Sequence, residues 1–265
     1  MILPNMVKNI ISLGLLQGVN YILPLITIPY LFRVLGAEQY GLVAFGYAFI
    51  QYFIIITDFG FNLSSVKYVS ENRDNPLVVN NHVNSVLLAK FLLSLGCLLI
   101  VILLAVSIEK FNQEFIFYIS FFGMVLGNAA FPLWYFQGIE RMKFITIINV
   151  LAKLLSVIPF FIFIHQPDDY YQVPIYYSLG YIISGIYSLY LVYYKIGLRF
   201  YFVKMSDVFD VLKESSGYFL SRASLSLFTT SNTFVLGLVC GNVFVGYYAI
   251  AEKLYQAYNS LISPI

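Results

Sequence analysis

The chain has 265 residues and a net charge of +2; 60% of its residues are hydrophobic and only 11% are charged. Soluble domains carry about 25% charged residues, so this composition excludes a cytosolic enzyme, a secreted disulfide scaffold and a disordered protein. We therefore expect an all-α, polytopic membrane protein, and the small net charge does not indicate a nucleic acid partner. Cys97 and Cys240 lie in apolar runs and are interpreted as small core residues, and the sequence shows no metal, nucleotide or cofactor motif.

Eight apolar stretches are long enough to cross the ~30 Å hydrocarbon core of a bilayer, which takes about 20 helical residues. We expect each of them to form a transmembrane helix. In chain order they cover residues 9–33, 40–62, 83–108, 115–137, 144–165, 173–195, 217–239 and 243–265.

The basic residues between these stretches predict the orientation, because Lys and Arg concentrate in short cytoplasmic loops. With a cytoplasmic N-terminus, two basic residues lie outside, Arg33 and Lys110. Nine lie inside: Lys8, Lys67, Arg73, Arg141, Lys143, Lys195, Arg199, Lys204 and Lys213. We therefore predict a cytoplasmic N-terminus. The longer cytoplasmic segments are 63–82 and 196–216, and the second alternates apolar and charged residues as an amphipathic interfacial segment does.

Six charged residues lie inside the expected spans, where each costs at least ~2.5 kcal/mol on insertion scales and so requires an explanation. Asp58, Lys90 and Arg222 lie within about two turns of the cytoplasmic end, where long side chains can reach the interface. Lys153 and Glu252 lie near the middle of their spans, where an interhelical ion pair or a water-filled cavity is required, and Lys253 follows Glu252. We favour a cavity with an excess of positive charge, which suits an anionic ligand.

Uncharged polar residues support a shared cavity. Glu252, Gln256 and Asn259 are spaced as one helix face, and Gln17 and Asn20 begin a similar stripe in the first span. The seventh span contains the polar run 229–233. Each such residue alone is more simply explained by hydrogen bonds between helices, but together they favour a cavity lined by spans one, seven and eight.

An internal repeat emerges when the chain is shifted by 205 residues. Six identities then fall within residues 31–53, including Gly36 with Gly241 and Gly41 with Gly246. Because this shift preserves orientation, we expect a parallel repeat. We assign residues 1–195 to a six-helix lobe, 196–216 to a cytoplasmic linker, and 217–265 to the first two helices of a second, incomplete lobe.

Several motifs resemble those of the O-antigen flippases, which are polysaccharide transporters of the multidrug/oligosaccharidyl-lipid/polysaccharide exporter superfamily. The resemblance covers essentially the whole chain and is most specific in the first span. It rests on residues 17–31 (QGVNYILPLITIPYL), 33–36 (RVLG), 40–41 (YG), 58–62 (DFGFN), 134–138 (WYFQG) and the end of the chain, 259–264.

The resemblance implies a twelve-span, two-lobe transporter of the bacterial inner membrane, of which this chain would supply eight spans. Its implied substrate is an undecaprenyl-diphosphate-linked oligosaccharide that moves from the cytoplasmic to the periplasmic leaflet, with proton or sodium coupling. Other polysaccharide assembly proteins are possible partners. We expect a substrate-binding cavity formed by six residues: Arg222, Lys153, Lys253, Lys90, Gln17 and Asn20. Glu252 and Asp58 would couple transport or form ion pairs.

Three alternatives remain open on the sequence. A drug/cation antiporter of the same superfamily would require a mainly acidic cavity, which the charge balance opposes. A membrane enzyme would need a sizeable polar loop with catalytic residues, and the expected outer loops are short. A non-transporting truncated fragment would account for the missing spans.

Overall fold

The computed structural model describes the backbone of residues 3–262 and the side chains of residues 18, 22–226 and 231–256. Every regular element in the described backbone is a helix, which confirms the all-α expectation. The elements are α1 (Leu3–Asp58), α2 (Phe61–Glu71), α3 (Pro76–Ser107), α4 (Glu109–Asn112), α5 (Phe115–Ala129), α6 (Leu133–Gly138), α7 (Met142–Phe163), the 3-10 helix η1 (Pro167–Gln172), α8 (Val173–Tyr190), the π-helix η2 (Leu191–Lys195), α9 (Met205–Val239) and α10 (Asn242–Ile262).

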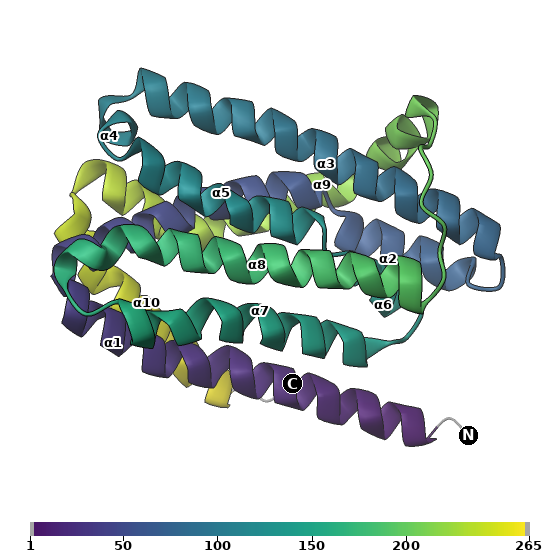
Figure 1. The fold of residues 1–265 in the computed structure, drawn as a ribbon, viewed down its shortest axis with the longest axis horizontal. Helices are drawn as coiled ribbons and strands as arrows, with labels where there is room; N and C mark the ends of the chain where they lie inside the picture. The colour runs from purple at the N-terminus through teal and green to yellow at the C-terminus, as the bar shows by residue number, and fades with distance from the viewer. Residues whose placement is uncertain (1–2, 263–265) are drawn as a thin grey trace.

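The long element α1 is a hairpin of two helices and not one rod. Its helical geometry is interrupted at Gly36, whose φ of 76° and ψ of 171° are accessible essentially only to glycine. The two halves run in opposite directions (Figure 1) and correspond to the first two expected spans. A second glycine of positive φ, Gly241, separates α9 from α10 in the same way.

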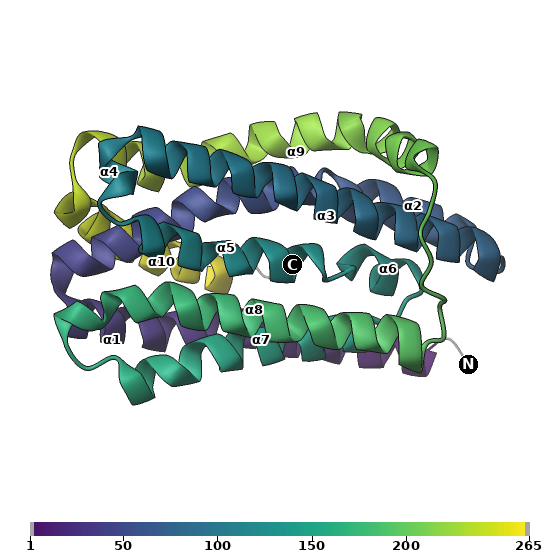
Figure 2. The same cartoon turned by 45° about the horizontal axis from the view of Figure 1, so that its top comes forward.

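The helices lie side by side as a bundle whose connections gather at two ends (Figure 1). One end holds the turn at Gly36, α4, η1 and the α9–α10 turn, which are the segments expected on the side of the membrane opposite the cytoplasm. The opposite end holds the connections from α2 to α3, from α6 to α7 and from η2 to α9. The view in Figure 2 shows α9 lying along α2 and α3.

The chain is a multi-pass membrane protein. By length and hydropathy, five helical segments of the described residues could cross a membrane: Ile22–Glu71, Pro76–Ser107, Phe115–Gly138, Met142–Phe163 and Pro167–Lys195. The outer surface is apolar, as on α3, where Leu99 and Leu103 are more than 60% exposed whereas Ser94 and Cys97 on the opposite face are buried. This inverted pattern fits a helix that faces lipid. The total of eight spans stays a prediction.

Both expected cytoplasmic segments contain helix. Residues 63–82 form most of α2 and the start of α3, so the loop between these helices is only 72–75. Asn75 ends that loop because its side chain accepts a hydrogen bond from the Val78 N–H, and Pro76 occupies the first turn of α3. Residues 205–216 are continuous with α9, where Val208 and Val211 pack inward.

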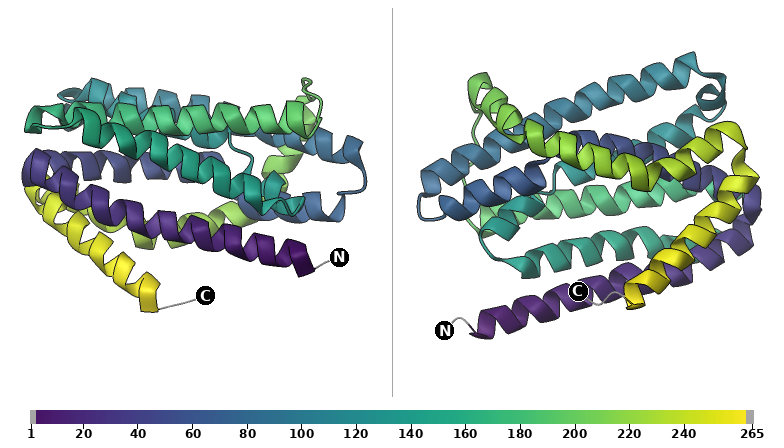
Figure 3. Two further views of the ribbon diagram at one scale, coloured as in Figure 1. Left: turned by 60° about the horizontal axis from the view of Figure 1, so that its bottom comes forward. Right: turned by 180° about the vertical axis from the view of Figure 1, so that it is seen from behind.

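The expected repeat has a geometric counterpart in the contact between α1 and α10. A Cβ added to Gly41 would collide with the carbonyl oxygen of Asn242, and one added to Gly246 would collide with that of Ala37. These two contacts interchange under the same 205-residue shift, which is the relation that a two-fold axis through the contact would produce. From this point α10 spreads away from the first half of α1 (Figure 3).

Candidate functional site

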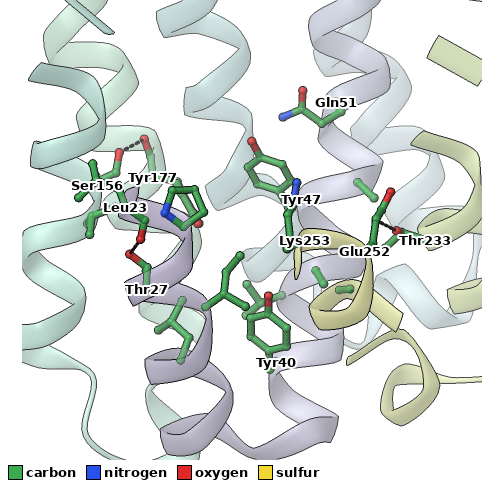
Figure 4. Close-up of a pocket in the computed structure, with 18 of the residues that line it drawn as sticks. Leu23, Thr27, Tyr40, Tyr47, Gln51, Ser156, Tyr177, Thr233, Glu252 and Lys253 are labelled. Atoms are coloured by element: carbon green, nitrogen blue, oxygen red, sulfur yellow. Dashed lines mark hydrogen bonds between the residues drawn. The ribbon is translucent and has the colours of Figure 1, made fainter. Parts of the chain in front are cut away.

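A cavity of about 420 Å³, whose mostly apolar lining includes several polar and charged side chains, opens between the two halves of α1 and helices α7, α8, α9 and α10. Its volume falls in the usual range for small-molecule sites, roughly 300–1,000 Å³. Its polar lining residues are Thr27, Tyr40, Tyr47, Gln51, Lys153, Ser156, Tyr177, Tyr181, Thr233, Glu252, Lys253 and Gln256, most of which are drawn in Figure 4.

Three charged side chains line this cavity: Lys153 from α7, and Glu252 and Lys253 from α10. Glu252 is held by neutral donors, because its carboxylate accepts hydrogen bonds from Thr233 Oγ1 at 3.1 Å and from Gln256 Nε2 at 3.4 Å. Lys253 donates to Gln256 Oε1 at 3.1 Å. Within the described part of the chain, none of the three forms an ion pair.

The two lysines line the same cavity, so their like charges oppose each other there. With one carboxylate and two ammonium groups, the described lining carries a net charge of +1 when all three are ionised. Figure 4 shows Glu252 directed toward Thr233, while Lys253 points to the side of the cavity where Tyr47 lies. The positive charges are therefore left without a carboxylate partner in the described cavity.

Four tyrosines form much of the remaining wall, and the sequence analysis did not single them out. Tyr40 and Tyr47 come from the second half of α1, and Tyr177 and Tyr181 come from α8. Their separations of seven and four residues place each pair on one helix face, and this periodicity could have indicated them. On the neighbouring helix, Ser156 Oγ donates to the Ala152 and Tyr177 carbonyls at 2.8 and 3.4 Å, which links α7 to α8.

A smaller cavity of about 120 Å³ adjoins the first and shares Lys153 and Tyr181 with it. Asp58 lines it, and its carboxylate accepts hydrogen bonds from Lys90 Nζ at 2.8 Å, Asn128 Nδ2 at 3.2 Å and Asn62 Nδ2 at 3.2 Å. The side chain of Lys90 is only 1% exposed. Buried Lys90 and Asp58, whose side chain is 23% exposed, thus form an ion pair between α1 and α3.

Comparison with known protein families finds a match over nearly the whole chain. The family model described as "Polysaccharide biosynthesis protein" matches residues 6–265. The chain belongs to this family.

Two curated relatives carry the name "Putative O-antigen transporter". The protein of Escherichia coli (strain K12) is 29% identical over 258 residues, which cover 97% of this chain and 62% of the relative. The protein of Shigella dysenteriae is 33% identical over 264 residues, which cover 98% of this chain and 65% of the relative. The chain therefore spans less than two thirds of the length of these relatives. No solved structure matches the chain.

In this member of the polysaccharide biosynthesis family, the structure separates the residues singled out from the sequence. Lys153, Lys253 and Glu252 come together in the larger cavity, and Asp58 lines the smaller one. Lys90 lines neither cavity, because its ammonium is paired with Asp58. Arg222 also lines neither and is exposed on α9. The side chains of Gln17, Asn20 and Asn259, and of the first two threonines of the run 229–233, lie outside the described residues.

Proposed function

We propose that this chain supplies a transport pathway for undecaprenyl-diphosphate-linked O-antigen repeat units, from the cytoplasmic to the periplasmic leaflet of the bacterial inner membrane. One observation carries the proposal: a cavity between the helices contains two lysines without carboxylate partners, in a family of polysaccharide biosynthesis proteins. Both relatives have names that describe transporters and not enzymes.

The chemistry of the cavity suits this substrate. A diphosphate cannot cross hydrocarbon unaided, because burying an unpaired charge costs far more than burying a paired one. Lys153 and Lys253 would supply the positive charges, and lysine is a common point-charge partner of phosphate. The tyrosine rings and Gln51 offer apolar faces and hydrogen-bonding groups to a sugar, while the lipid tail remains in the bilayer.

Glu252 suits a coupling role. Its carboxylate is bound by Thr233 and Gln256, and neither is charged. We propose that it takes up the coupling proton, or pairs with a lysine in one state and releases it in the other. Alternating access would then come from rocking of the two lobes. A cation antiporter is less favoured, because the described cavity carries more positive than negative charge.

The distribution of basic residues supports a cytoplasmic N-terminus. The end of the bundle with the Gly36 turn, α4, η1 and the α9–α10 turn contains two of the basic residues assigned to loops, Arg33 and Lys110 (Figure 1). The other nine belong to the opposite end. By the positive-inside rule, that opposite end would face the cytoplasm.

Binding of inorganic pyrophosphate to the 265-residue chain in lipid nanodiscs tests the proposal. We expect Lys153→Gln and Lys253→Gln each to weaken binding about tenfold, corresponding to one lost charge-assisted contact of ~1.4 kcal/mol. The matched control is Lys204→Gln, an exposed lysine outside the cavity, which should change nothing. Arg222→Gln tests the remaining basic residue. Equal binding by wild type and the Lys153→Gln/Lys253→Gln double variant would refute the anion site.

A further inference from the structure

One face of α8 and η2 is exposed along its length and changes from aliphatic to aromatic at its end. Its residues are spaced by three or four positions, as on one side of a helix, and each is at least 45% exposed: Leu179, Ile183, Ile186, Tyr190 and Tyr194. Both helices belong to a segment that could cross a membrane, Pro167–Lys195. The aliphatic part of the face therefore fits lipid tails, and the two tyrosines lie where aromatic residues gather at a membrane interface.

The connection to α9 continues this aromatic surface across the end of the bundle (Figure 1). Ile196, Leu198 and Val203 pack against the buried core. Phe200 and Phe202, in contrast, are 66% and 86% exposed, and their ring centroids lie 5.6 Å apart. Exposed aromatic rings next to a lipid-facing helix fit the boundary between headgroups and acyl chains.

Three asparagines of α3 hold this connection in place. The Asn80 side chain accepts a hydrogen bond from the Arg199 N–H at 3.0 Å, and the Asn84 side chain donates one to the Arg199 carbonyl, also at 3.0 Å. The Tyr201 hydroxyl donates to Asn81 Oδ1 at 3.2 Å. Because these bonds fix the backbone around Arg199, the connection presents its exposed side chains from a defined position.

Positive charge accompanies the aromatic rings. Lys195 and Arg199 are exposed, and neither forms an ion pair within the part of the chain that the structure describes. Residues 191–203 contain no acidic residue, and the next basic residue, Lys204, lies within one turn of Asp207. Two cations without carboxylate partners beside an aromatic surface are complementary to an anionic group at the membrane surface.

We propose that Lys195, Arg199 and the exposed rings of Tyr194, Phe200 and Phe202 form a docking site for the headgroup of an anionic phospholipid. The rings would lie at the boundary between headgroups and acyl chains, while the guanidinium and ammonium groups bind the phosphate. The lipid would hold the connection between the two expected lobes against the bilayer surface. The inference is independent of the transport proposal, because it uses no residue of either cavity.

Quenching of tryptophan fluorescence by brominated lipids tests the headgroup site. The wild-type chain has one tryptophan, Trp134, which is fully buried and supplies the background signal. Phe202→Trp places a reporter at the site. The 265-residue chain is reconstituted in nanodiscs that contain acyl-brominated phosphatidylglycerol or acyl-brominated phosphatidylcholine, and the relative binding constant of the two lipids is measured. Leu99→Trp, at a 69% exposed position on α3, is the positional control.

At the Phe202→Trp reporter, we expect phosphatidylglycerol to bind more tightly than phosphatidylcholine, by about fivefold for each basic residue that contacts the headgroup. The preference should weaken at high salt, because the charges are exposed. Lys195→Gln/Arg199→Gln should abolish it. The Leu99→Trp reporter should show no preference, because no basic residue within one turn of Leu99 accompanies it.

A matched variant controls for net charge. Lys67→Gln/Arg73→Gln also removes two exposed basic residues at the same end of the bundle. These two residues are paired with Glu71 at 3.9 Å and with Glu140 at 3.1 Å, so their charges already have partners. We expect this variant to keep the lipid preference. The side chains of Lys195 and Arg199 make no hydrogen bond among the described residues, so their replacement leaves the described contacts intact.

Each outcome is decisive for the headgroup site. Equal quenching by the two lipids at the Phe202→Trp reporter overturns it, and so does a preference that survives Lys195→Gln/Arg199→Gln. Equal loss of the preference in both double variants also overturns it, because net charge alone would then attract the lipid. Absence of quenching by either lipid would mean that the connection faces water. None of these results depends on pyrophosphate binding, so the headgroup site and the proposed function fail separately.

Discussion

Removal of one partner of the Asp58–Lys90 ion pair tests directly how α1 packs against α3. In Asp58→Ala, the Lys90 ammonium would keep only the Asn128 carbonyl, at 3.2 Å, while its side chain is 1% exposed. Loss of one partner from a buried, hydrogen-bonded pair typically costs ~3–5 kcal/mol. We expect a loss of that size in the free energy of unfolding. Lys90→Met in the same background should recover most of it, since no buried charge then remains.

The buried cysteine of the chain allows this free energy of unfolding to be measured by thiol labelling. Cys97 on α3 is 1% exposed, whereas Cys240 is exposed. In a Cys240→Ala background, maleimide labelling of Cys97 during titration with SDS in mixed micelles therefore reports unfolding. The matched control is Lys67→Met, which breaks a pair between side chains that are 68% and 61% exposed, Lys67 and Glu71. Such a surface pair is worth roughly 0–1 kcal/mol.

The reasoning fails if Asp58→Ala and Lys67→Met cost the same. It also fails if Lys90→Met adds to the loss caused by Asp58→Ala, because two partners of one pair must show a coupling energy in the double-mutant cycle. Either result would mean that Asp58 and Lys90 do not form the contact that joins α1 to α3.

Three further predictions concern the α1–α10 contact, the loop end of the bundle and the orientation. Gly41→Ala and Gly246→Ala should each lower the free energy of unfolding by ~1–3 kcal/mol through overpacking against backbone, whereas Gly96→Ala, with open space around it, should not destabilise the chain. Burial lowers the pKa of Lys110, which lies between α3 and α5, contacts the Gly237 carbonyl and sits over the Phe45 ring. Between that lowered pKa and the ordinary value of 10.5, the unfolded chain binds more protons than the folded chain. The free energy of unfolding of the wild type, relative to that of Lys110→Met, should therefore rise with pH in this range, as measured by denaturation at a series of pH values. A fall with pH would contradict the prediction. Exposed Cys240 should react with a membrane-impermeant maleimide from the periplasmic side of spheroplasts, and labelling only from inverted vesicles would reverse the orientation.

Composition and local pattern were enough for the outline of this protein. The scarcity of charge and the long apolar stretches predicted an all-α membrane protein, because a helix in hydrocarbon must satisfy its backbone within its own residues. Gly36 and Gly41, matched with Gly241 and Gly246, predicted a repeat, and the two glycine contacts between α1 and α10 have the matching geometry. The motif at residues 17–31 indicated the family. Glu252, Lys253 and Lys153 could be singled out from the sequence because a charged side chain near the middle of a transmembrane helix is energetically costly, however the helices pack.

Only the tertiary structure decided which polar groups meet. Asp58 and Lys90 are 32 residues apart and each alone could reach the interface, but the packing of α3 against α1 leaves the Lys90 side chain only 1% exposed and makes Asp58 its partner. The same packing takes Lys90 away from the larger cavity and leaves Arg222 exposed on α9. It also places Lys153 on the wall between two cavities. Sequence spacing reports which residues share a helix face, whereas pairing between helices depends on their rotation and crossing, which distant residues determine together.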